Sequence, residues 1–515
     1  MATSPITNVF VIMLENHSFD HLLGFSGITG TDAVTGQPTS INGLSNQSNS
    51  YNGQTCTVSQ PAVDPMVVDP GHEFLDVLMQ LCGTGATYPW AGNYPPICTN
   101  ANPPVCNSGF LADWLTSPSS GEGNPPPGHA CDIMTACSPA QTPVLNFLAT
   151  EFAVCDSWFS SMPGPTWPNR FFAHGASSSG LDHSPSTDEI ATWETVAGFK
   201  FPNGSIFDAI NGLSDGSFRL YFNSVYGSTF PFKTWLPGVP LGNLPTVAAL
   251  HNISLTQVVP FSVFPQDLAN GYPYMYTYIE ASYGAVAAGT YVGGNSDHPI
   301  DTVANGEAFL STFYNTLRAS SIWDTSLLII TWDEHGGYYD HVPPPAAVPP
   351  GDTTPSHSNS YYEYGFTFAQ YGVRVPAVVV SPLIPQNLID HRTYDHSSIP
   401  AAVESIFGLS ALTKRDAAAN DPSKLASLTT ARSTPATTPN PPASAPAPAG
   451  AAATRPLNES IQNGDLPGFL YIAMREHARV TSESEAKARI ATVRTRQDAI
   501  NYLNEVTEKV KLARG

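Results

Sequence analysis

Two pairs of polar residues each follow a short apolar run, and together they offer the oxygen atoms that bind a divalent cation. Glu15 and Asn16 end one run near the N-terminus, and Asp333 and Glu334 end another more than three hundred residues later. Unbroken apolar runs of this length predict strands buried on both faces, as in a parallel sheet covered by helices. Ligands bind beyond the carboxyl ends of such strands. We therefore expect the four side chains to meet at one edge of a sheet and to hold a metal ion.

A hydroxyl nucleophile is the second candidate feature. Pro163, Pro165 and Pro168 bracket Thr166, so the chain there forms a stiff turn before a helix that starts near Asn169. Free N–H groups at a helix N-terminus favour phosphate anions. A threonine in such a turn is ordinarily a helix cap, and the residue types alone leave both interpretations open.

Three histidines are candidate general acids or donors to phosphate oxygens: His72, His298 and His335. A single histidine is usually a surface or core residue, but many of the histidines of this chain lie beside the segments discussed here. Pro299 keeps His298 off a helix, and Asp297 is placed to orient an imidazole or bind metal. We expect His298 to protonate the leaving group and His72 to donate to phosphate.

Further segments in the same order strengthen the interpretation. The ordered set resembles the bacterial phosphoesterase family of phosphatidylcholine-type phospholipases C and certain acid phosphatases, within the alkaline-phosphatase-like superfamily. The resemblance spans roughly residues 8 to 410. Besides the two metal-binding pairs, the matching segments are residues 71–72, 162–170, 276–280, 297–299 and 394–397.

The resemblance implies a two-step mechanism. Thr166, activated by the metal ion, would attack phosphorus, and the alcohol would leave with a proton from His298. Water would then hydrolyse a phosphothreonine intermediate. Oxygen ligands suit calcium, magnesium or manganese, and the resemblance implies zinc as a further possibility, because the superfamily also uses zinc. The resemblance also implies substrate contacts from Asn169, Asp297 and His335.

Composition and aromatic content bear on the substrate. The net charge of the 515 residues is -21, and the excess lies in residues 1–454, which argues against nucleic acid and against anionic lipid surfaces. The Tyr-rich stretches 272–283 and 361–371 suit a choline headgroup through cation–π contacts, although aromatic residues mostly pack cores. We expect a phospholipase C-like enzyme acting on a zwitterionic phospholipid. The alternatives are an acid phosphatase and, less favoured, a non-catalytic interaction protein on the same fold.

The cysteines bear on the compartment. All seven lie in the first third of the chain, several in a Pro/Gly-rich stretch, which favours disulfides and an oxidising environment. Cys155 lies in an apolar run and is expected to be a buried thiol. No signal peptide and no apolar run long enough to span a membrane is visible. We expect an extracellular or periplasmic protein, with a cytoplasmic location left open.

The elements that must position these residues predict an α/β fold: a central, mostly parallel β-sheet between helical layers, alkaline-phosphatase-like, with long loop insertions at residues 26–70 and 83–140. The expected strands are residues 9–14, 151–155, 218–222, 274–279, 327–332 and 375–380, and the expected helices are 74–81, 142–148, 306–320 and 398–407.

Three regions are expected along the chain. Residues 1–425 should form the catalytic domain. Residues 426–455 are rich in Pro, Ala, Ser and Thr and should form an extended linker. Residues 456–515 carry charged residues at helical spacing and should form a small helical C-terminal segment.

Overall fold

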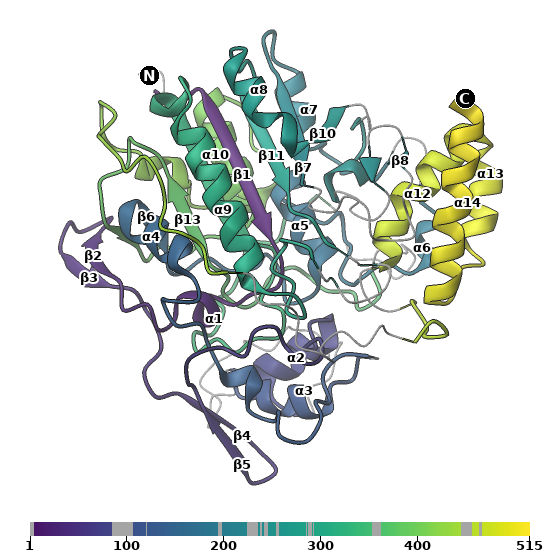
Figure 1. Ribbon diagram of the computed structural model, residues 1–515, viewed down its shortest axis with the longest axis horizontal. Helices are drawn as coiled ribbons and strands as arrows, with labels where there is room; N and C mark the ends of the chain where they lie inside the picture. Colours follow the sequence, from purple (N-terminus) through teal and green to yellow (C-terminus); the bar gives the residue numbers. More distant parts are fainter. Residues whose placement is uncertain are drawn as a thin grey trace.

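A ten-stranded sheet forms the centre of the computed structural model (Figure 1). The structure describes residues 5–84, 107–119, 121–193, 198–223, 235–236, 239–240, 246–253, 257–284, 286, 291, 293–352, 362–443, 456–462 and 466–514. The strand order is β10-β7-β11-β1-β12-β13-β6-β14-β2-β3, and neighbours are parallel except for β12–β13, β13–β6 and β2–β3. The predicted α/β fold with a mostly parallel sheet is confirmed.

The six predicted strands are all present, with ends shifted by at most two residues. They are β1 (Asn8–Leu14), β6 (Ala153–Cys155), β7 (Phe218–Phe222), β11 (Tyr276–Glu280), β12 (Ser326–Trp332) and β13 (Ala377–Val380). The strands without a prediction are β2 (Thr29–Asp32), β3 (Pro38–Ser40), β4 (Ser48–Tyr51), β5 (Gln54–Thr57), β8 (Trp235–Leu236), β9 (Val239–Pro240), β10 (Val258–Pro260) and β14 (Leu388–Asp390). At two to four residues, each of these is too short to show a hydrophobic period.

The four predicted helices are also present. They are α2 (Phe74–Cys82), α4 (Pro143–Glu151), α9 (Val303–Arg318) and α10 (Ser398–Phe407). The other helices of the catalytic body are α1 (Phe19–Leu23), α3 (Phe110–Thr116), α5 (Thr166–Gly175), α6 (Thr187–Ile190), α7 (Ile206–Asn211), α8 (Phe264–Ala269) and α11 (Lys414–Ala418).

Helices cover both faces of the sheet. Val11 pairs with Tyr278 across β1 and β11, so both side chains point to the same face. The Tyr278 ring contacts His174 of α5, with 4.7 Å between ring centroids. Phe10, which alternation directs to the other face, contacts Phe313 of α9 at 5.9 Å. Helices α5 and α9 therefore lie on opposite faces, and Figure 1 shows α9 lying across β1.

This packing corrects one expectation about the substrate. The Tyr-rich stretch 272–283 was expected at the mouth of the site, but Tyr276 and Tyr278 are fully buried and Tyr272 packs on Phe10. Because β11 lies near the centre of the sheet, these rings face the helical layers and serve the core.

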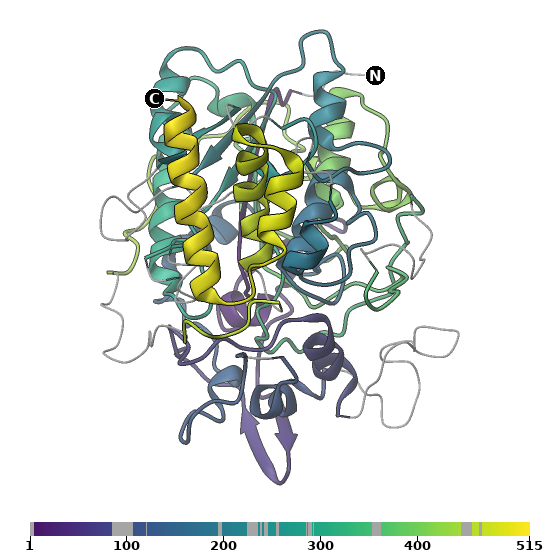
Figure 2. The same ribbon diagram turned by 90° about the vertical axis from the view of Figure 1, so that its right-hand side faces the viewer.

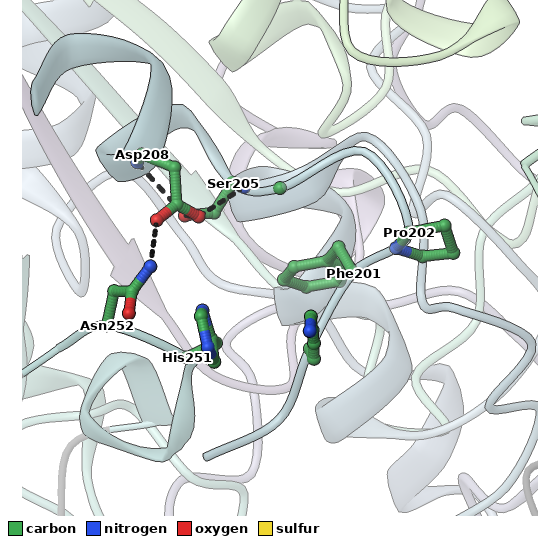
Figure 3. Close-up of a pocket in the computed structure, with 8 residues that line it drawn as sticks. Phe201, Pro202, Ser205, Asp208, His251 and Asn252 are labelled. Carbon is green, nitrogen blue, oxygen red and sulfur yellow. Dashed lines mark hydrogen bonds between the residues drawn. The ribbon is translucent and has the colours of Figure 1, made fainter. Parts of the chain in front are cut away.

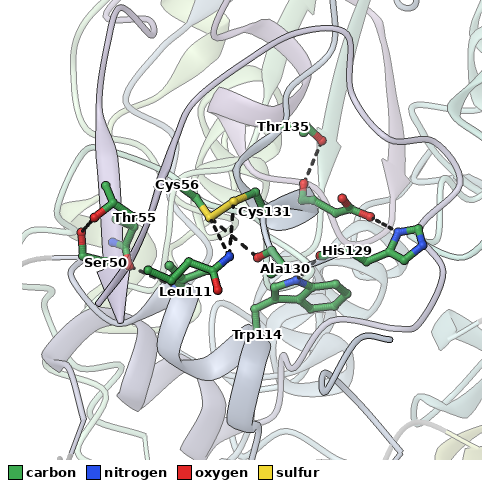
Figure 4. Close-up of a disulfide and its surroundings, with 12 residues drawn as sticks. Ser50, Thr55, Cys56, Leu111, Trp114, His129, Ala130, Cys131 and Thr135 are labelled. Carbon is green, nitrogen blue, oxygen red and sulfur yellow. Dashed lines mark hydrogen bonds and ion pairs between the residues drawn. A yellow bond between two sulfur atoms is a disulfide. The ribbon is translucent and has the colours of Figure 1, made fainter. Parts of the chain in front are cut away.

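The two insertions fold together into a second, smaller core. Apolar side chains of α2 and α3 pack against Val58, Ile133 and Met134, and a disulfide joins Cys56 to Cys131 (Figure 4). The expectation of a disulfide in the insertions is thus confirmed, while Cys98 and Cys106 lie outside the described residues. Cys155 is a buried thiol, as expected, and burial raises its pKa. Figure 2 shows this part of the molecule below the sheet, with the β4–β5 hairpin projecting from it.

The C-terminal region also packs against the body. The described part of the expected linker lies on α9, where Arg318 and Tyr314 donate hydrogen bonds to the carbonyls of Thr434 and Pro435. Three helices follow, α12 (Leu466–Val480), α13 (Glu483–Ile490) and α14 (Arg496–Arg514), seen in yellow in Figure 2. A Cβ at Gly468 in α12 would come within 2.2 Å of the Trp167 indole. Within the described ranges, we find no helix with the length and apolar character to cross a membrane.

Candidate active site

The two polar pairs that follow β1 and β12 lie side by side. The two strands are parallel, and their register pairs Leu14 with Trp332, the last residue of each strand. The backbone N–H of Asp333 donates to the carbonyl of Leu14 (3.1 Å), and the N–H of Asn16 donates to Oδ1 of Asp333 (2.9 Å). Both pairs are buried. The structure thus brings Glu15, Asn16, Asp333 and Glu334 to one edge of the sheet.

Thr166 faces this edge from the start of a helix. It is the first residue of α5, after a turn that ends at Pro165, and its side chain is fully buried. The hydroxyl oxygen lies 3.5 Å from Oδ1 of Asn16. The predicted turn is confirmed, but α5 begins at Thr166 and not near Asn169, because Pro168 falls in the first turn of the helix, where proline is tolerated. The hydroxyl thus lies beside Asn16, a residue of the expected metal site.

The turn before Thr166 is held by Asn169. The side-chain amide nitrogen donates to the carbonyls of Met162, Gly164 and Pro165, and the side-chain oxygen accepts the backbone N–H of Met162. Since both ends of the amide are used within the turn, Asn169 holds the turn that carries Thr166. The expected contact of Asn169 with substrate stays a prediction.

Arg170 is a central residue that we did not predict to be functional. Its Nε donates to Oδ2 of Asp333 (2.9 Å), and its Nη1 lies 3.7 Å from the Glu280 carboxylate. Burial opposes the charge, but Tyr283 and Asp333 hold the pKa of Arg170 well above its usual value. The signal in the sequence was its place four residues after Thr166, on the same face of α5.

We expect Arg170→Met to lower the free energy of unfolding by about 3–5 kcal/mol, because it leaves buried carboxylates without their cation. Urea denaturation of the purified variant measures this. The control is Arg219→Met, which breaks the half-exposed ion pair with Asp267 and should cost less than about 1 kcal/mol. Equal losses of unfolding free energy in the two variants would show that the buried ion pair stabilises the fold no more than the partly exposed one.

His298 and His72 lie close together beside the strand ends. Their ring centroids are 6.4 Å apart. His298 Nε2 lies 3.5 Å from the carboxylate of Asp69, and the ring of Tyr291 stacks on His298 at 3.4 Å. His72 Nδ1 lies 2.8 Å from the carbonyl of Pro70. The two imidazoles thus lie within reach of one another and of an acidic side chain.

Asp297 faces the protein interior. Its Oδ2 accepts a hydrogen bond from the indole N–H of Trp332 (3.2 Å), and a Cβ at Gly306 would collide with this carboxylate. The residue has a φ of 72°, and burial raises its pKa. These contacts fix the loop that carries His298.

His335 is placed behind the expected metal ligands. Its Nε2 lies 2.6 Å from Oε1 of Gln80, and its Nδ1 lies 3.3 Å from Oε2 of Glu334. Burial lowers the pKa of His335 to about 3, so the ring is neutral at ordinary pH. The side chain therefore lies between Gln80 and Glu334. Its expected contact with substrate stays a prediction.

The donor set fits a hard divalent cation. Carboxylates and one neutral amide oxygen are the groups that calcium, magnesium and manganese prefer. In a different group of described residues, Asp20, Asp340 and His341, two carboxylate oxygens and an imidazole nitrogen lie within 4.8 Å of one another. There, Arg374 donates to both carboxylates (2.9 Å each), so this group forms an ion-pair network around a guanidinium.

Residues 6–410 match the Phosphoesterase family. The chain belongs to this family. Non-specific phospholipase C1 of Arabidopsis thaliana is 34% identical over 427 residues, covering 80% of this chain and 69% of that protein. Phospholipase C B of Mycobacterium tuberculosis is 26% identical and covers 79% and 74%. The solved structure of a protein in the alkaline phosphatase superfamily from Vibrio parahaemolyticus is 14% identical, with a TM-score of 0.31. The match covers 53% of this chain and 62% of that protein's chain. The chain is thus a hydrolase of phosphoric esters.

A surface pocket of about 290 Å³ lies elsewhere on this phosphoesterase (Figure 3). Phe201 lines it and contacts Gly175, the last residue of α5, whereas Thr166 is the first. Its acid, Asp208, caps α7 through Ser205 and accepts a hydrogen bond from Asn252. The pocket therefore lies at the far end of α5 from the strand ends.

Proposed function

We propose that this chain is a metal-dependent phosphoesterase that cleaves phosphocholine-type diesters, as a phospholipase C does, through a phosphothreonine intermediate. The observation that carries the proposal is the buried Thr166 hydroxyl at the N-terminus of α5, 3.5 Å from Asn16 at the strand ends. Peptide N–H groups there favour a phosphate anion, and oxygen ligands lie on the other side.

Four residues would hold the cation: Glu15, Asn16, Asp333 and Glu334. When bound, a divalent cation supplies positive charge that favours the alkoxide form of a nearby hydroxyl and stabilises charge on phosphate oxygens. The protein prepares this site through its own contacts. Two backbone N–H groups donate to Oδ1 of Asp333, and the N–H of Gly336 donates to Oε2 of Glu334 (2.7 Å).

The residues act in two steps. Thr166 attacks phosphorus as its alkoxide, forming the P–O bond of a phosphothreonine, while the bond to the alcohol breaks. His298 gives its proton to the leaving oxygen, and His72 donates to a phosphate oxygen. Water then attacks the phosphothreonine, His298 takes a proton from that water, and the P–O bond to Thr166 breaks to restore the alkoxide. Asn169, Asp297 and His335 position these groups.

His298→Gln should separate esters by their leaving groups. The variant should lower kcat/KM, which reports the first step alone, for a choline phosphodiester of an ordinary alcohol by about 10²–10⁴-fold, the usual contribution of a general acid. It should lower kcat/KM for the p-nitrophenyl ester much less, because nitrophenolate leaves without a proton. Steady-state kinetics on both esters measures this. Equal losses of kcat/KM on the two esters would show that His298 is not the general acid.

The alternative function is an acid phosphatase acting on monoesters, since the same groups would serve both reactions. The acidic character of residues 1–454 and the relatives named phospholipase C favour the diester. The deciding experiment compares p-nitrophenyl phosphate with p-nitrophenylphosphorylcholine across pH and added metals. We expect higher kcat/KM for the phosphorylcholine ester, and the reverse order would establish the monoesterase.

The Cys56–Cys131 disulfide supports an oxidising compartment as the site of action. We therefore place the enzyme outside the cytoplasm, where a zwitterionic phospholipid is available as a substrate.

A further inference from the structure

A short aromatic segment, residues 362–368, packs beside the turn that carries the nucleophile. Tyr362, Phe366 and Phe368 of this segment are buried in a small apolar cluster, separate from the main core, that also contains Phe74 and Met162. Met162 belongs to the turn before Thr166. We call residues 362–368 the aromatic wall.

The aromatic wall contacts the start of α2. The ring of Tyr364 stacks on Phe74, with 4.5 Å between centroids and 15° between planes, and Phe366 meets the same ring edge-on at 5.5 Å. Phe74 follows His72 by two residues, so the wall reaches the side of the site where the alcohol is protonated. Tyr364 is the partly exposed ring of this cluster, and it brings the apolar surface toward solvent.

One buried carboxylate fixes the aromatic wall. Asp182 accepts the backbone N–H groups of Glu363 (2.9 Å), Tyr364 (3.2 Å) and Phe366 (3.0 Å). The side chain is fully buried, and two residues earlier a Cβ at Gly180 would lie 2.4 Å from the Tyr362 ring. Three N–H groups from one short segment on one carboxylate define the backbone of that segment closely.

The charge of Asp182 is supported by its neighbour. His183 Nδ1 lies 3.0 Å from Asp182, and His183 Nε2 lies 2.6 Å from Glu189 of α6. Burial opposes the charged ring, but hydrogen bonds to both acids raise the pKa of His183 to about 10. The imidazolium therefore lies between two carboxylates, and it holds Asp182 in the position where that side chain accepts the backbone N–H groups of the wall.

The other end of the aromatic wall is tied to the nucleophile turn. Arg415 donates to the carbonyl of Phe368 (2.7 Å) and to the carbonyl of Ser161 (3.3 Å). Ser161 directly precedes Met162. The segment is thus held at its start by Asp182 and at its end by a residue that also holds the approach to Thr166.

We propose that Asp182 is a positioning residue that holds the aromatic wall as the binding surface for the acyl chains of the leaving diacylglycerol. The proposal rests on the function proposed above, which places the alcohol on the side of His298 and His72. The wall begins near His72, through the contact with Phe74, and its partly exposed ring is Tyr364. An apolar surface in that place selects an alcohol with hydrocarbon chains.

The test compares two substrates that differ only in their acyl chains: a short-chain, water-soluble phosphatidylcholine and glycerophosphocholine. In the wild type, the acylated ester should have the lower KM. Asp182→Asn keeps the shape but halves the capacity to accept hydrogen bonds, and it should raise KM for the acylated ester about tenfold or more. The kinetic constants for glycerophosphocholine should change less than about twofold, within the noise of a distant substitution.

Two further variants keep the test informative. Tyr364→Ala removes part of the aromatic wall directly and should show the same selective rise in KM if Asp182→Asn does not fold. Thr367→Ala is the control, because this residue lies in the same segment and its side chain is exposed.

Equal losses on both esters in Asp182→Asn and Tyr364→Ala, or no loss on either, would overturn the proposal. A wild type that hydrolyses p-nitrophenyl phosphate but neither choline ester would overturn the proposed substrate class, and the role of the wall with it.

Discussion

Thr166→Ala should lower kcat by at least about 10³-fold on every phosphoester that the wild type hydrolyses, because the first bond to phosphorus is made by the hydroxyl that this substitution removes. The loss should appear with little change in the free energy of unfolding, since one hydroxyl at the start of a helix contributes about 1 kcal/mol or less. Steady-state kinetics and urea denaturation of the purified variant measure the two quantities.

Two companion variants sharpen this prediction. Thr166→Ser keeps a hydroxyl in the same turn and should retain far more activity than Thr166→Ala. Thr187→Ala removes another buried hydroxyl, one that donates to Val493 in the C-terminal region, and should leave kcat close to that of the wild type. Near-normal turnover in a folded Thr166→Ala protein would exclude Thr166 as the nucleophile.

Asp333→Asn should abolish tight binding of the divalent cation and most of the activity. Asp333 contributes a negative charge to the donor set and also fixes its neighbours, by accepting the backbone N–H groups of Asn16 and Glu334. A weaker ligand at this position should lower both metal affinity and kcat. Metal analysis after dialysis, followed by activity with added calcium, magnesium, manganese or zinc, measures the effect.

The control comes from the other buried acidic group, Asp20 and Asp340 beside Arg374. Asp340→Asn removes the same charge from the network around Arg374, at a position that is equally buried. It should reduce stability but leave the metal content unchanged. Chelator-treated wild type should regain activity when the correct cation is added. Full activity in metal-free wild type, or equal loss of metal in the two variants, would contradict the assignment of the site.

The sequence allowed the centre of this fold to be predicted because its strands are long and apolar on both faces. β1 and β12 each have seven buried residues in a row, and the polar residues after them mark the strand ends. The parallel register then brings the two ends together. The turn around Thr166 was predictable for a similar reason, since closely spaced prolines restrict the backbone in the same way in any fold.

The supporting residues were not predictable because their roles arise from distant contacts. Gln80 reaches His335 from α2, more than two hundred residues away along the chain, and Glu280 meets Arg170 only after β11 has joined the sheet. Asn169 and His335 illustrate the same limit. Their residue types suited contact with phosphate, but backbone carbonyls and neighbouring side chains use their polar atoms in the folded chain.

The most direct test of the account is to identify the group that carries phosphorus during turnover. The enzyme is mixed with a p-nitrophenyl phosphoester, quenched in acid within the first turnover, digested and mapped by mass spectrometry. We predict one added group on the side chain of Thr166, a phosphoryl group from p-nitrophenyl phosphate or a phosphocholine group from p-nitrophenylphosphorylcholine, and none in Thr166→Ala. Phosphorus on a histidine instead, or burst release of nitrophenol with no covalent phosphoryl-enzyme, would contradict the account.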